Sequence, residues 1–295
     1  MNAPRGITWP YAVIALLAVA AAAIGLLRPQ LIPAAAATSG KKKPGATALL
    51  KQNPPPALFT DAEIATIGKQ AVDQGKKADA LFAQWKAAHG TTRDDKAFAG
   101  WAAQQVPAPP TAKQRTAELH QVQTLAKIRS AAGRKAASWL ELHGKKDIWK
   151  LYLHDQRELI PATQGTAEKA ELKAALKMAK TISDQLAAKD KQPAPFVLDP
   201  ALRPDKHIKP GAKGPYSYPS RHAARSAAAV TLLSALSPHR TEDYEWMRAE
   251  VLYSRLYMAG HLPSDLTAGT LLGDLIGDYE LAVSGCRAAQ TCRDR

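Results

Sequence analysis

Apolar residues in this chain recur at the spacing of a helix, and this periodicity constrains the fold more than any other feature. Between residues 64 and 85, and again between 172 and 186, they return every three or four positions on one helical face. No run alternates with the period of two of a strand for long enough to build a sheet. The sequence therefore predicts an all-α fold, a helical bundle.

Capping and breaking residues place the ends of the predicted helices. Thr60-Asp61-Ala62-Glu63 has the pattern of a capping box, and Gly90 is a suitable stop for the helix that it starts. A short helix is expected over 94–104 and a long helical pattern covers 112–143. Seven prolines interrupt the helical pattern between Lys189 and Pro219, and a loop of this length is usually functional or disordered.

The N-terminal part carries an apolar run. Residues 9–27 are nearly all apolar, close to the minimum for crossing a bilayer, and the small residues at 34–37 suit a signal peptidase. We therefore interpret 1–37 as a signal peptide or a single membrane anchor, with the protein exported or anchored in the cell envelope. If the segment stays uncleaved, Lys41-Lys42-Lys43 would instead favour a cytoplasmic body by the positive-inside bias.

The remaining chain divides by composition into three parts. Lysines and prolines in 38–59 are typical of a flexible linker. Residues 60–110 are expected to form an N-terminal helical extension, and 111–295 the main helical domain. Within that domain Gly269, Gly273 and Gly277 fall four apart on one helix, which would let a second helix approach closely.

Charge and cysteine content narrow the class of function. The formal net charge of +14 favours anionic partners such as phosphates. No zinc-finger spacing, RNA-binding aromatic motif or Walker-type glycine loop accompanies this charge, so we expect no nucleic-acid partner. Cys286 and Cys292 cannot supply a metal quartet, and they form either a small disulfide loop or two thiols.

Two histidines are expected at helix starts in the last third of the chain. Ser220 is a good N-cap, which places His222 in the first turn of a helix. Proline is favoured in a first turn, so a later helix begins near Pro263, with His261 just before it and Asp265 inside it. Free amides at helix starts bind anions.

These residue types suit phosphoryl transfer. A carboxylate near a histidine stabilises the charge that develops on the ring and makes it a better nucleophile. A second histidine can protonate a leaving oxygen, and Arg255 can neutralise a phosphoryl group through two parallel hydrogen bonds.

Order and spacing add a family resemblance. Pro219-Ser220-Arg221-His222, followed by Ser254-Arg255, His261 and Asp265, resembles the second and third signature motifs of the type 2 phosphatidic acid phosphatase and vanadium haloperoxidase superfamily. The third motif matches at all its defining positions. The resemblance implies the α-helical bundle of that family. Because the chain has a single apolar segment, the branch of bacterial non-specific acid phosphatases fits best.

The resemblance also implies roles. His261 would be the nucleophile that forms a phosphohistidine, Asp265 its orienting partner and His222 the acid for the leaving group. Arg255 and the amides after Ser220 would hold the phosphate. The substrate would be a phosphorylated small molecule or lipid, and no metal or other cofactor is implied, although vanadate could occupy the same cradle.

The phosphate-holding half departs from the family pattern. Arg221 stands where the second motif has glycine, and the best alignment of the first motif puts Ala187 and Ala194 at its lysine and arginine. The nearby cations that could replace them are Lys189, Lys191, Arg203 and Arg221. These departures leave two alternatives open: a degenerate homologue that binds phosphorylated ligands without turnover, and a vanadium-dependent haloperoxidase.

Overall fold

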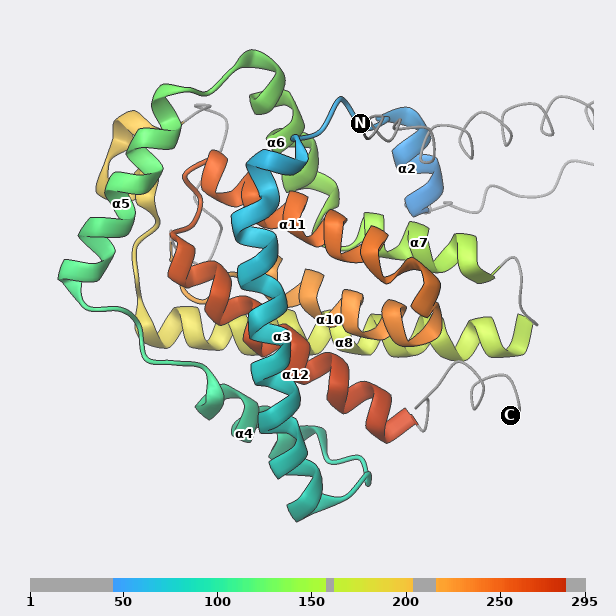
Figure 1. Ribbon diagram of the computed structural model, residues 1–295. Coiled ribbons are helices and arrows are strands. Elements are labelled where there is room, and N and C mark those ends of the chain that lie inside the picture. Colours follow the sequence, from blue (N-terminus) through green and yellow to red (C-terminus); the bar gives the residue numbers. More distant parts are fainter. Residues whose placement is uncertain (1–44, 158–161, 204–215, 285–295) are drawn as a thin grey trace, which may run out of the picture. The chain divides into compact units, whose positions relative to one another are not determined.

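The computed structural model describes residues 45–157, 162–203 and 216–284 (Figure 1). Within these ranges every regular element is a helix, and the one β-bridge joins Pro193 to Tyr216. The prediction of an all-α fold is confirmed. The predicted leader or anchor at 1–37 and both cysteines lie outside the described residues.

The helices follow one another as α2 (Ala46–Gln52), α3 (Asp61–His89), α4 (Asp95–Gln105), α5 (Ala112–Lys127), α6 (Ala131–His143), α7 (Asp147–Arg157), α8 (Ala162–Asp190), α9 (Pro195–Leu198), α10 (Arg221–Leu236), α11 (Thr241–Tyr257) and α12 (Pro263–Ser284), with 3₁₀ turns at η1 (Pro200–Leu202) and η2 (Pro238–Arg240). None of the described helices is long and apolar enough to cross a bilayer.

Helices α10 and α12 form the centre of the bundle, and α3, α8 and α11 pack around this pair (Figure 1). The side chains of α10 and α12 that face each other are small, which allows the backbones of these two helices to approach closely. A Cβ added at Gly269 would overlap the carbonyl of Ser220, and one at Gly273 would overlap the carbonyl of Ala224. Gly277 likewise faces the side chain of Thr231. The expectation that this glycine stripe admits a second helix is confirmed.

This packing predicts a large difference between two glycine-to-alanine substitutions. Gly273→Ala is expected to destabilise the protein by about 2–4 kcal/mol, because its methyl group meets backbone that cannot move aside. Gly100→Ala, on the exposed face of α4 with no atom near the new Cβ, should stabilise by about 0.5–1 kcal/mol. Urea denaturation of both variants measures the difference. Equal effects would show that the contact between α10 and α12 is looser than described.

The predicted extension and linker both contain packed helices. Thr60 and Glu63 form the expected capping box at the start of α3, and Gly90 ends that helix with a φ of 67°. Helix α3 packs against α11 and α12. Part of the segment predicted as a linker instead forms α2, because good helix formers follow Gly45. The division of the chain into an extension and a main domain stays a prediction.

The long helix predicted over 112–143 was wrong, because the structure has two helices there. Ser130 breaks the pattern: its side chain accepts a hydrogen bond from Gly133 N and caps α6. Its own amide donates to the hydroxyl of Tyr257 at 2.7 Å. Because of this break, α6 is a separate helix from α5. The C-terminal residues of α6 contact the ends of α10 and α11 that carry the candidate site residues.

A buried carboxyl group on α11 links stability to pH. Glu250 is fully buried and accepts a hydrogen bond from Phe59 N at 3.3 Å. Burial raises its pKa to about 8, against the opposing effect of that hydrogen bond. The folded protein therefore holds a proton that the unfolded chain releases, and this contribution to stability is lost as pH rises from about 4.5 to about 8.

Glu250→Gln should remove this dependence, because the amide keeps an acceptor for Phe59 N and cannot ionise. We expect the variant to be more stable than the wild type by about 3–4 kcal/mol at pH 8 and by less than about 1 kcal/mol at pH 5. Urea denaturation at both pH values is the measurement, with the exposed Glu242→Gln as control. A gain of the same size at both values would contradict the predicted titration.

Candidate active site

The N-terminus of α10 brings His222 into the bundle. Ser220 accepts a hydrogen bond from Ala223 N at 3.3 Å, so it caps the helix as predicted. Its own amide donates to the backbone carbonyl of Asp265 at 2.8 Å. This bond joins the start of α10 to the start of α12, and His222 and His261 consequently face one another with ring centroids 6.3 Å apart.

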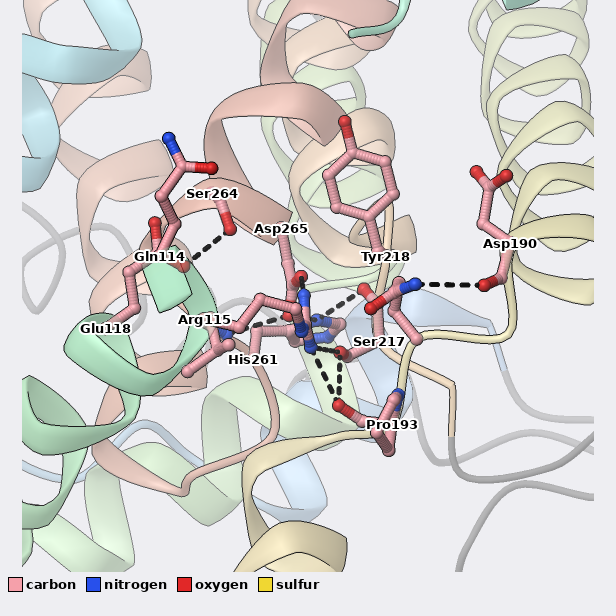
Figure 2. Close-up of polar contacts among 12 residues, drawn as sticks. Gln114, Arg115, Glu118, Asp190, Pro193, Ser217, Tyr218, His261, Ser264 and Asp265 are labelled. Atoms are coloured by element: carbon pink, nitrogen blue, oxygen red, sulfur yellow. Dashed lines mark hydrogen bonds and ion pairs between the residues drawn. The ribbon is translucent and has the colours of Figure 1, made fainter. Parts of the chain in front are cut away.

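His261 precedes α12 and is held by backbone. Its Nδ1 lies 2.9 Å from the carbonyl oxygen of Ser217, which accepts only a protonated nitrogen (Figure 2). A proton therefore sits on Nδ1, so in the neutral ring Nε2 is the nitrogen that carries the lone pair. The side chain is 12% exposed, so the ring remains accessible. This is the tautomer that a nucleophilic Nε2 requires.

Asp265 lies behind His261 and is fully buried. Its Oδ2 is 3.8 Å from Nδ1 of His261, beyond hydrogen-bonding distance, and accepts instead from Leu262 N at 2.8 Å. Burial would raise the pKa of Asp265, but His261, Arg115 and the Leu262 amide together lower it below its ordinary value. The ionised carboxylate thus stabilises positive charge on His261, while the Ser217 carbonyl orients the ring.

Arg115 on α5 is a residue that the sequence reasoning missed. Its side chain is buried, and Nη1 donates to Oδ1 of Asp265 at 3.0 Å. Nη2 donates to the carbonyl of Pro193 at 2.8 Å and lies 3.5 Å from the Ser217 hydroxyl (Figure 2). One guanidinium therefore ties together three segments that surround His261. Nothing in the pattern of α5 distinguishes this arginine from its other polar residues.

A second cluster forms where α6 meets the ends of α10 and α11. Arg255 is buried and contacts Glu141, whose Oε2 also lies 3.4 Å from Nε2 of His222. Lys145, in the turn that follows α6, donates to Oε1 of the same glutamate at 2.7 Å. Arg255 Nε is buried without a hydrogen-bond partner among the described residues. Glu141 and Lys145 were also missed, because only the folded chain brings α6 to this place.

The comparison with known families fits this geometry. Residues 177–280 match the sequence model of the PAP2 superfamily. This part of the chain is similar to that superfamily. The match spans both histidines, Arg255 and Asp265, and the resemblance read from the motifs is confirmed. No curated protein matches the chain.

The PAP2 match supports phosphoesterase-type chemistry, and phosphatases of that superfamily need no cofactor. Among the described residues no group of three histidine, cysteine or acidic side chains is placed to hold a metal ion. The candidate residues within the matched range are the two histidines, Arg255 and Asp265.

Two further cations, Arg221 and Lys191, were predicted to bind the phosphate. Arg221 is 38% exposed and donates to Asp184 on α8 at 3.2 Å, so its charge is already partnered. Lys191 is exposed directly after α8, and in the described part of the chain no hydrogen bond or ion pair joins its side chain to the histidines. Ala194 is buried and precedes α9. The cations of the first motif have no direct replacement at those positions.

The environment of His222 controls its protonation. Burial lowers its pKa well below the ordinary value; Glu141 opposes this shift, and Arg255 and Lys145 reinforce it. The ring is consequently neutral at pH 7 in the unliganded protein. A neutral histidine does not protonate a leaving group efficiently, so catalysis by His222 requires acidic solution or an anionic ligand that restores the proton.

Proposed function

We propose that this chain is an acid-phosphatase-like phosphomonoester hydrolase that works through a phosphohistidine on His261. The observation that carries the proposal is the orientation of His261: Nδ1 is bound to the Ser217 carbonyl at 2.9 Å and the ring faces His222, while no hydrogen bond joins Nε2 to another described residue. Its position within the PAP2 match and the buried, unpartnered Nε of Arg255 support it.

The reaction would proceed as two successive displacements at phosphorus. Nε2 of His261 attacks phosphorus, the bond to the ester oxygen breaks, and protonated His222 gives its proton to that oxygen. Water then attacks the phosphohistidine while His222 takes a proton from it, and inorganic phosphate leaves. Arg255 and the free amides after Ser220 stabilise the phosphoryl oxygens, and the buried charge of Asp265 offsets the positive charge on His261.

The proposal also includes the cellular location of the enzyme. The apolar segment at 9–27 would export the domain or anchor it to the membrane, which places the active site in the cell envelope. Substrates would be phosphorylated small molecules or lipids. Arg221 and Lys191 would attract them as cations at the edge of the site.

The test compares leaving groups. The full chain, without added metal, is assayed on 4-nitrophenyl phosphate and on an alkyl phosphate, each with the wild type and His222→Gln. Loss of the acid should reduce turnover of the alkyl ester far more than that of the aryl ester, whose leaving group needs little protonation. Equal losses on both substrates would contradict the role of His222.

The alternatives give other results. Phosphate binding without turnover of either ester identifies a degenerate binding protein, a reading motivated by Ala194 and by the partnered Arg221. Halide oxidation that appears only after vanadate is added identifies a haloperoxidase. Either result would overturn the proposed hydrolase.

A further inference from the structure

A carboxylate already lies in the place where the site must hold its anionic ligand. Glu141 contacts Arg255, approaches Nε2 of His222 to 3.4 Å and accepts from Lys145 at 2.7 Å. These are the donors expected to bind phosphoryl oxygens or the leaving oxygen. The Glu141 carboxylate therefore holds the same cations that a bound phosphoryl group would contact.

Glu141 stays ionised over the working pH range. Burial would raise its pKa, but Arg255, His222 and Lys145 together lower it far below its ordinary value. The charged groups that face it come from three places: Lys145 in the turn after α6, His222 on α10 and Arg255 on α11. If the Glu141 carboxylate were removed, the positive charges of Arg255 and Lys145 would remain without it.

The groups around the two histidines provide too little positive charge to neutralise a dianionic ligand. Arg255 and Lys145 contribute two positive charges, and Glu141 cancels one of them. Arg115 is partnered by Asp265, and Arg221 shares Asp184 with Lys180 away from this cluster. Within the cluster of Arg255, Lys145 and Glu141 the surplus is one positive charge while the histidines are neutral. A ligand with one negative charge neutralises this surplus, and a ligand with two exceeds it and is repelled by Glu141.

We propose that Glu141 makes this site selective for phosphoryl groups that carry a single negative charge. Two kinds of ester fit this chemistry: phosphomonoesters below their second pKa of about 6, and phosphodiesters at any pH. The proposal rests on the proposed function, because it names the ionic form of the substrate at that site. Glu141 acts as a specificity-determining residue that touches the same donors as the phosphoryl group.

Binding at one pH isolates the effect of ligand charge from that of histidine protonation. Inorganic phosphate, mostly dianionic at pH 8, and dimethyl phosphate, a monoanion, are titrated calorimetrically into the full chain. Glu141→Gln should tighten phosphate binding by about tenfold and dimethyl phosphate binding by about threefold, because a double charge doubles the interaction free energy. Glu242→Gln makes the same change of net charge at an exposed position and should alter neither affinity.

Activity separates the two sources of monoanion. The wild type is assayed on 4-nitrophenyl phosphate and on methyl 4-nitrophenyl phosphate at pH 5 and pH 8. Monoester turnover confined to pH 5 identifies the protonated monoester, and diester turnover retained at pH 8 identifies the diester. In Glu141→Gln the monoester should gain relative to the diester at pH 8.

Other outcomes overturn the proposal. Equal tightening of both anions by Glu141→Gln means that the residue adds only general charge, and weaker binding of both means that it positions Arg255. In either case the wild type still binds phosphate or turns over ester, so the proposed function survives. If neither wild type nor variant binds phosphate or cleaves ester, the proposed function itself has failed.

Discussion

Replacing His261 by alanine is expected to reduce kcat on 4-nitrophenyl phosphate by at least about 10³-fold, because no described group could form the covalent intermediate in its place. The ring is 12% exposed and, among the described residues, hydrogen-bonds to the Ser217 carbonyl. After its loss the buried Asp265 keeps Arg115 and the Leu262 amide as partners, so the fold should persist. Circular dichroism of the variant checks the fold, and steady-state kinetics measure the loss. His120→Ala, at an exposed position on α5, is the matched control.

Trapping the phosphohistidine intermediate tests directly whether His261 is the nucleophile. Wild-type protein quenched in alkali during turnover should carry phosphate that is stable to base and labile to acid, as a phosphohistidine is. His261→Ala should carry none. Turnover that survives the substitution would eliminate the covalent mechanism, and labelled phosphate on the variant would place the nucleophile elsewhere.

Arg115→Met is expected to destabilise the protein by about 3–5 kcal/mol, the largest effect on stability that we predict. Asp265 is fully buried and its Oδ1 accepts from Arg115, so the substitution leaves a carboxylate with an unsatisfied oxygen in the core. Thermal and urea denaturation measure the loss. Lys76→Met breaks an exposed pair with Asp73 on α3 and should change stability by less than about 1 kcal/mol.

A double variant tests the reason for this loss. Adding Asp265→Asn to Arg115→Met removes the uncompensated charge, so it should recover part of the stability lost by the single variant. If the double variant is less stable than Arg115→Met, the arginine stabilises the fold mainly through Pro193 and Ser217 rather than through the carboxylate.

The features that the sequence predicted correctly are those set by near neighbours in the chain. A capping serine and a proline in a first turn act over three or four residues, so Ser220 and Pro263 located the starts of α10 and α12. The same local rules placed His222 inside one helix and His261 outside the next. The glycine stripe also could be interpreted locally, because it lies on a single helix.

The features that the sequence could not supply depend on helix packing. Arg115 and Asp265 are 150 positions apart, and Glu141 precedes His222 by 81. Their side chains meet only after α5 and α6 have docked on the central pair, and no motif marks either residue. The break at Ser130 was missed because the flanking helices have similar composition, although that break is what brings α6 to the site.

The hydrogen bond between the Ser220 amide and the Asp265 carbonyl makes the two histidines depend on one helix pair. Each histidine lies at the start of its helix, and the glycine stripe fixes how closely those helices approach. A substitution at Gly277, two turns along α12 from Gly269, would then alter the separation of His222 and His261 without touching either. Catalytic rate in this protein should therefore report on the bundle core, and variants there should be screened by kinetics as well as by stability.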